Sequence, residues 1–152
     1  MTCTARRATL ADVDALVGLM AEFYAESAHA LDVAWADASF RRLLRDDALG
    51  CAWVVRVGAA LAGHCVLTLR YSMEHGGLEG YVDDLFVRPA HRRKGAATAA
   101  MQALVAECVR RNALALTVEA GQDNTPANAL YARFGLMPRD DHRVTRTVTL
   151  RR

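Results

Sequence analysis

The segment YVDDLFVRPAHRRKGAATAAM, residues 81–101, decides the fold of this chain. Its first part, YVDDLFV, is apolar enough to form a β-strand, and it ends at Arg88-Pro89. Beyond the basic run at residues 91–94 the pattern changes to a helical period, which predicts a long helix from about Gly95 to Arg111. The apolar side of that helix is formed by Ala97, Met101, Leu104, Val105 and Cys108.

The start of this helix is suited to bind an anion. The first backbone N–H groups of a helix have no partner within it and lie at the positive end of its dipole. Because Gly95 to Thr98 carry small side chains, a phosphate can approach those N–H groups closely. Arg92, Arg93 and Lys94 add positive charge nearby. We therefore expect a pyrophosphate group at this point, and a merely solvated basic loop is the alternative.

The remaining pattern predicts a mixed sheet with helices on both faces. A short strand-like piece and two helices come first, the second helix around Ala36–Leu44. Three strand-like runs follow, CAWVVRV, LAGHCVLTLRY and GYVDDLFV, with a short hairpin connection at residues 58–60. After the long helix come the strand ALALTVEA, which reads as buried, the helix TPANALYARFG and the alternating run HRVTRTVTL, which predicts a last strand. The order is therefore β-α-α-β-β-β-α-β-α-β, an α+β fold with an antiparallel meander in the middle.

The predicted helices carry recognisable end signals. Thr9, followed three residues later by Asp12, resembles a capping box before the first helix. Asn112 is a suitable residue just beyond the end of the long helix. Thr125 as N-cap and Pro126 at the first helical position predict where the last helix starts.

Composition and charge narrow the class of protein. The chain has 152 residues, which fits one domain spanning residues 1–152, and its formal net charge is only +2. That charge is too small to indicate a nucleic-acid-binding protein. No apolar run is long enough for a signal peptide or a membrane span, so we expect a cytoplasmic protein with no membrane or nucleic-acid partner. The four cysteines are far apart without a C-x-x-C pair, and no metal site is expected.

Two motifs carry a family resemblance. The spacing R-x-x-G-x-A, from Arg92 to Ala97, resembles the acetyl-CoA pyrophosphate loop Q/R-x-x-G-x-G/A of the GNAT superfamily of N-acetyltransferases. The segment NTPANALYARFG resembles the second motif of that family, N-x-x-A-x-x-x-Y-x-x-x-G, here Asn124, Ala127, Tyr131 and Gly135. The motif region covers residues 81–138, and its strand YVDDLFV looks closest to the diamine- and small-amine-acetylating branch. One departure is the small Ala96, where the family often has a bulky aliphatic residue.

The resemblance implies acetyl-CoA as cosubstrate and assigns its binding residues. Main-chain groups of Leu85, Phe86 and Val87 would pair with the pantetheine arm as a further strand, and an N–H there would polarise the thioester carbonyl. Asn124 would bond to the same arm, and a turn residue before a helix is the alternative. The pyrophosphate would be held chiefly by backbone N–H groups of the loop and helix start, which are Arg92, Arg93, Lys94, Gly95, Ala96, Ala97 and Thr98.

The resemblance also implies which residues handle protons. Tyr131 falls where the family has a tyrosine hydroxyl beside the sulfur, so it is expected to contact acetyl-CoA and act as general acid; a core aromatic residue is the alternative. Asp83 is expected to act on the amine, directly or through water, and Asp84 to contact the substrate or the protein. Neighbours on a regular strand point to opposite faces, so at most one should face a given cleft, but the resemblance implies a bulge in this strand that could relax the rule. Glu119 is the alternative base, and a salt-bridged or edge pair is the non-catalytic alternative.

These assignments predict an acyltransferase that moves acetyl from acetyl-CoA to a primary amine by direct attack in a ternary complex. The acceptor is a small-molecule amine or a lysine or N-terminal amine, and the loop with Glu74, His75 and Glu79 would border its site. The resemblance also implies a homodimer, because the family often forms dimers. A non-catalytic CoA or acyl-CoA sensor, which keeps the anion site and lacks proton-handling groups, is the alternative function.

The remaining histidines and tryptophans belong to no motif. His64, His75 and His91 are isolated in the sequence, so each is expected to lie at the surface or to be satisfied by hydrogen bonds. Trp35 and Trp53 are expected to be packing residues.

Overall fold

The computed structural model describes residues 1–139 and 142–151. Its elements follow the predicted order up to the last helix. They are β1 (Cys3–Arg7), the short 3-10 helix η1 (Leu10–Asp12), α1 (Val13–Glu26), α2 (Val33–Arg45), β2 (Gly50–Val57), β3 (Ala60–Ser72), β4 (Gly77–Val87), the 3-10 helix η2 (Pro89–His91), α3 (Ala96–Arg110), β5 (Ala115–Val118) and α4 (Thr125–Arg133).

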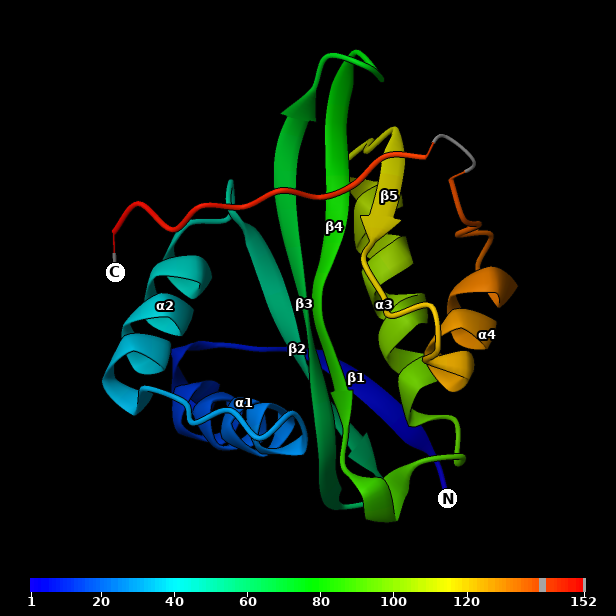
Figure 1. Cartoon of the computed structure of the whole chain (residues 1–152). Helices are drawn as coiled ribbons and strands as arrows, with labels where there is room; N and C mark the ends of the chain where they lie inside the picture. Colours follow the sequence, from blue (N-terminus) through cyan, green and yellow to red (C-terminus); the bar gives the residue numbers. More distant parts are fainter. Residues whose placement is uncertain (140–141, 152) are drawn as a thin grey trace.

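The strands form one sheet in the order β1-β2-β3-β4-β5. Neighbouring strands are antiparallel from β1 to β4, whereas β4 and β5 are parallel because α3 connects them. Helices α1 and α2 lie on one side of the sheet, and α3 and α4 lie on the other (Figure 1). The prediction of a mixed, mostly antiparallel α+β fold with helices on both faces is therefore confirmed.

Alternation along the strands divides the apolar residues between two cores. Val54 and Val66 point towards α1 and α2, whereas Val55 and Leu67 point towards α3. Fully buried leucines on the helices complete each side, and burying one contributes roughly 1.5–3 kcal/mol. Such leucines are Leu16 of α1 and Leu104 of α3.

Helix ends follow local signals with small shifts. The backbone N–H of Thr9 donates to the carboxylate of Asp12 over 2.8 Å, but this box caps η1 ahead of α1. Asn112 has a φ of 58°, the left-handed conformation expected just after a helix. The prediction for the last helix is wrong by one residue, because Asn124 and not Thr125 is its N-cap: the Asn124 side chain accepts from the Ala127 N–H over 3.4 Å.

The C-terminal segment differs from its prediction. Residues 142–151 form no strand, although their alternating pattern indicates one. The segment is extended in Figure 1 (red), and Val144, Val148 and Leu150 are exposed. Alternation supplies strand propensity, but a strand forms only where a neighbouring chain accepts its hydrogen bonds. The strand β5 is also shorter than predicted and only half-buried.

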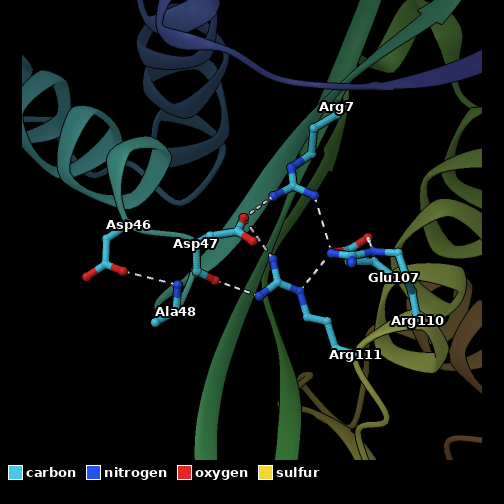
Figure 2. A network of polar contacts seen from close by, with 7 residues as sticks. All are labelled: Arg7, Asp46, Asp47, Ala48, Glu107, Arg110 and Arg111. Carbon is cyan, nitrogen blue, oxygen red and sulfur yellow. Dashed lines mark hydrogen bonds and ion pairs between the residues drawn. The ribbon is translucent and has the colours of Figure 1, made fainter.

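A network of ion pairs links the C-terminal end of α3 to β1 and to the turn before β2 (Figure 2). Arg111 contacts Asp47 over 3.0 Å and Glu107 over 2.7 Å. Arg7 of β1 reaches the same two carboxylates over 2.6 Å and 3.3 Å. Because both arginines share both carboxylates, the network fixes the orientation of α3 against β1 and the turn before β2.

Candidate active site

The sheet opens between β4 and β5. These strands pair only over Glu79–Val82 and Ala115–Val118. After that point β5 ends, whereas β4 continues to Val87. One edge of β4 from Asp83 onwards is therefore not paired with β5, and an extended ligand can add to it as a strand would.

The loop after β4 leads into the start of α3. Arg93 and Gly95 have positive φ values of 62° and 92°, whereas Lys94 between them does not. Alternation of this kind turns successive N–H groups towards one point and forms an anion-binding concavity. Gly95 is the N-cap of α3, and the first turn continues with the buried Ala96 and the half-buried Ala97. These residues fit a diphosphate, since the helix start is open and carries no bulky side chain.

Two of the three basic side chains in the loop have other partners. The Nε of Arg92 donates to the carbonyl oxygen of Val87 over 2.8 Å, and its Nη2 pairs with Glu26 of α1 over 2.5 Å. Lys94 donates to the carbonyl oxygen of Ala90 over 3.0 Å. Among the residues that the structure describes, only Arg93 of the three makes no such bond. The side chains of Arg92 and Lys94 therefore hold the loop, and the expectation that residues 92–98 bind the pyrophosphate chiefly through backbone N–H groups stays a prediction.

A further cationic side chain, which the sequence did not indicate, lies at the start of α3. Arg133 of α4 donates to the hydroxyl of Thr98 in the first turn of α3 over 3.3 Å. The two residues are 35 positions apart in the chain, so no local pattern indicates the contact. Its only sequence signal is a basic residue close behind Tyr131 in the second motif.

Asp83 and Asp84 line one cavity because β4 has a bulge at Asp83, where its pairing with β3 shifts by one residue. Val66 pairs with Asp84 and Leu67 pairs with Val82, so Asp83 has no pairing partner on β3. The cavity has a volume of about 230 Å³ and lies between this bulge and helices α1 and α2. Its other lining residues are Met20, Trp35, Ser39, Phe40, Leu43, Val66 and Thr68.

The two carboxyl groups influence each other. Asp83 is exposed to solvent overall, but its carboxyl group lies against the protein. The protein displaces water from the carboxyl group, and this desolvation raises the pKa of Asp83. The negative charge of Asp84 raises it further. A carboxyl group with a raised pKa holds a proton more strongly than an ordinary aspartate, which suits a group that accepts one.

Tyr131 lies on the other face of the sheet. It belongs to α4, and its side chain is buried in the core on the α3 side of the sheet, in the same cluster as Cys65 and Val87. Burial raises the pKa of Tyr131, and the nearby Cys65 thiol adds to the effect. Asp83 and Asp84 line the cavity on the side of α1 and α2, so the expected acid and base approach from opposite faces of the sheet. The unpaired edge of β4 is the place where groups from both faces can reach one ligand.

Two other acidic residues that the sequence singled out, Glu119 and Glu79, have partners within the protein. Glu119 accepts from Thr145 over 3.1 Å and also hydrogen-bonds with Tyr81, whose pKa burial and this bond raise to about 12. Glu79 is buried, and it pairs with Arg70 over 2.7 Å.

Glu79 and Glu74 both have partners within the protein. The Thr117 hydroxyl donates to Glu79 over 2.5 Å, so both oxygens of that carboxylate have partners. Glu74 pairs with Arg139 over 2.9 Å. Glu74 and Glu79 are therefore paired within the protein, and neither lines the cavity beside Asp83 and Asp84.

No group of three or more histidine, cysteine, aspartate or glutamate side chains that could hold a metal ion lies within residues 1–139 and 142–151. In the same part of the chain, no helix is long and apolar enough to span a membrane. Trp53 is buried in one core and Trp35 packs against the other, as expected, and Trp35 also lines the cavity beside the aspartates.

Comparison with known proteins identifies the family. The model of the acetyltransferase (GNAT) family matches residues 18–136. The chain belongs to the GNAT acetyltransferases. It is therefore an acyltransferase that uses acetyl-CoA, and the open helix start and unpaired β4 edge fit that cosubstrate. Among curated proteins none matches the chain.

Solved structures share the fold along the whole chain. An integron cassette protein from the mobile metagenome of Cole Harbour Salt Marsh is 38% identical, with a TM-score of 0.87, and the match covers 98% of this chain and 91% of that one. A "predicted acetyltransferase with acetyl-CoA" from Clostridium acetobutylicum is 18% identical, with a TM-score of 0.77 and coverage of 95% and 96%. AAC(6')-Iy, solved with the bisubstrate analogue CoA-S-monomethyl-acetylneamine, is 15% identical, with a TM-score of 0.77 and coverage of 100% and 99%.

Proposed function

We propose that this GNAT acetyltransferase transfers the acetyl group to a primary amine by direct attack in a ternary complex. One observation carries the proposal: Asp83 and Asp84 line a single cavity beside the unpaired edge of β4. A cationic amine in that cavity would meet carboxylates at the same place where the thioester of a strand-like ligand would lie. No covalent intermediate with the enzyme is needed.

Acetyl-CoA supplies an activated acyl thioester when it is bound. The N–H groups of Gly95, Ala96, Ala97 and Thr98 would hold its diphosphate, and Arg93 and Arg133 would add positive charge. Because Arg92 occupies the carbonyl oxygen of Val87, the other main-chain groups along this edge of β4 would pair with the ligand. Asn124 uses its side-chain oxygen as a helix cap, and its amide nitrogen can bond to the pantetheine arm.

The cavity supports a small amine as acceptor. Its volume of about 230 Å³ is below the roughly 300–1,000 Å³ typical of sites for drug-sized ligands. Trp35, Phe40 and Leu43 provide an apolar wall for the carbon chain, and the two rings can also attract a cation. A compact alkylamine therefore suits the site better than a long polyamine or a protein segment.

Proton transfer is assigned to two residues. An alkylammonium has a pKa of about 10.4 and must lose a proton before it can attack. Asp83, with its raised pKa and its place in the cavity, accepts that proton, whereas Glu119 is held by Tyr81 and Thr145. Tyr131 stays protonated because of its own raised pKa and donates to the sulfur as negative charge develops there. A thiol has a lower pKa, about 8.5, so this donation depends on the developing thiolate.

A thiol-release assay tests the proposal. The full chain is mixed with acetyl-CoA and a panel of primary amines, from short alkylamines to a polyamine and a lysine peptide. We expect free thiol and an acetylated product with short alkylamines, detected by mass spectrometry. Binding of acetyl-CoA without thiol release in any mixture would contradict the proposal and favour a non-catalytic CoA sensor.

A further inference from the structure

His64 on β3 is completely buried, with 0% of its surface exposed. Neither ring nitrogen has a hydrogen-bond partner among the residues that the structure describes. The prediction that His64 lies at the surface or is satisfied by hydrogen bonds is therefore wrong. Because buried polar groups in proteins nearly always have partners, an orphaned imidazole needs an explanation.

Two aromatic rings and one carboxylate lie close to the His64 ring. Its ring lies 6.3 Å from the ring of Phe40 on α2 and 6.2 Å from that of Phe86 on β4, measured between centroids. The Nε2 atom lies 3.6 Å from Oδ2 of Asp84. That separation is within ion-pair distance but too long for a hydrogen bond. Asp84 is the only charged partner within that range in the described part of the chain.

The position of His64 opposes stability. Burying a polar side chain without a hydrogen bond costs free energy, whereas an apolar side chain of similar size would fill the same space without that cost. His64 shares its face of β3 with Val66, two residues further along, which packs into the core beneath α1 and α2. A residue that weakens the core at this point, next to a cavity-lining carboxylate, has the character of a functional group.

We infer that His64 is a positioning residue that orients Asp84 for the amine, an inference that rests on the proposed function. In the tautomer with a proton on Nε2, the ring donates to Oδ2 of Asp84 once the two atoms approach by less than about 1 Å. Hydrogen bonds in active sites are often long before substrate enters and tighten afterwards. The bond holds Asp84 as the counter-charge of the ammonium group, while Asp83 takes the proton.

Three substitutions separate this role from packing. His64→Gln keeps an amide N–H close to the place of Nε2, so it retains the donor towards Asp84. His64→Asn places its amide nitrogen near Nδ1, which does not face Asp84, and it is the matched control. His64→Leu removes the donor and fills the space. The measurements are kcat, KM for an accepted short alkylamine, KM for acetyl-CoA and the thermal midpoint of each purified full chain.

The expected result is a separation of activity from stability. His64→Leu and His64→Asn should lower kcat about 10- to 100-fold, because a misoriented group in the site costs a factor of that size. His64→Gln should stay within about threefold of the wild type, and KM for acetyl-CoA should not change in any variant. His64→Leu should unfold at the same temperature as the wild type or higher. If the His64→Leu variant does not fold, the difference in kcat between His64→Gln and His64→Asn tests the inference.

Other results overturn the inference in distinguishable ways. Wild-type kcat in the Leu and Asn variants would leave the proposed function standing and remove the role of His64. Equal losses in all three variants, in step with their thermal midpoints, would assign His64 to packing alone. A wild-type chain that releases no thiol with any amine would overturn the proposed function and this inference together.

Discussion

The Nε of Arg92 donates a hydrogen bond to the carbonyl oxygen of Val87 over 2.8 Å. This bond ties the end of β4 to the loop that leads into α3. The same guanidinium pairs with Glu26 at the end of α1 and lies 5.9 Å from the ring centre of Phe86. Arg92 of the acetyl-CoA motif therefore holds the loop in place by linking the end of β4 to the end of α1.

We predict that Glu26→Ala weakens acetyl-CoA binding although Glu26 does not line the helix start. The ion pair is partly exposed, and such pairs contribute up to about 1 kcal/mol, so the dissociation constant should rise up to about fivefold. Arg92→Ala, which also loses the bond to Val87, should have a larger effect. Calorimetric titration with acetyl-CoA measures both. An unchanged affinity in both variants would show that the loop keeps its shape without Arg92.

Replacing Gly95 by valine should greatly weaken acetyl-CoA binding. Its φ of 92° is strained for any other residue, so relief of that strain would displace the loop that leads into α3, and the added Cβ would lie 3.8 Å from Sγ of Cys3. Gly76→Val is the matched control, since Gly76 has a φ of 74° in the turn between β3 and β4. Both variants should lose about 1–2 kcal/mol of stability or more from backbone strain, but only Gly95→Val should lose affinity. Equal affinities would argue against the diphosphate site.

Tyr131→Phe should lower kcat with little effect on acetyl-CoA affinity. General acid catalysis contributes roughly 10²–10⁴-fold, and the ring that packs in the core is retained. Tyr71→Phe, a change at an exposed tyrosine, provides the control. Steady-state kinetics and calorimetry together give the two quantities. A Tyr131→Phe variant with wild-type kcat would return Tyr131 to a purely structural role.

Asp83→Asn should shift the pH–rate profile to higher pH. A base works only when deprotonated, so wild-type kcat/KM should rise through the raised pKa of Asp83, above the ordinary aspartate value of about 3.9. Without this base the rate depends on the small fraction of neutral amine, which grows until the pH reaches about 10.4. The profile is measured with one accepted amine. An unaltered profile would point to Glu119 or to another base.

The ion-pair network predicts how stability depends on acid. Hydrogen bonds from Arg110 and Arg111 hold the pKa of Glu107 at about 2, below its ordinary value of 4.5. A folded-state pKa below the unfolded value stabilises the fold above the unfolded pKa, and this stabilisation is lost as the pH falls through the folded one. The thermal midpoint of Glu107→Gln should therefore be lower than that of the wild type at pH 7, and the gap should shrink between about pH 4.5 and pH 2. A gap that is constant over this range would contradict the assignment.

Local signals in the sequence were enough for most of the fold. Helix periodicity, the capping pair Thr9 and Asp12, and the hairpin at residues 58–60 each depend on residues close together in the chain, so short-range physics specifies them. The prediction of a last strand was wrong because strand formation depends on contacts between distant parts of the chain. Residues 142–151 have the right alternation, but a strand also needs an open neighbour, and that depends on the whole sheet.

The candidate site divides in the same way. The glycine and small residues that open α3 could be predicted from their order, because a helix start exposes its N–H groups wherever it lies. The resemblance implied a bulge near Asp83 and Asp84, but the cavity that both line, the ion pair of Arg92 with Glu26 and the burial of His64 beside Asp84 could not be predicted. Each joins segments distant in the chain, and only the packing of β3, β4 and α1 against one another brings those atoms within reach.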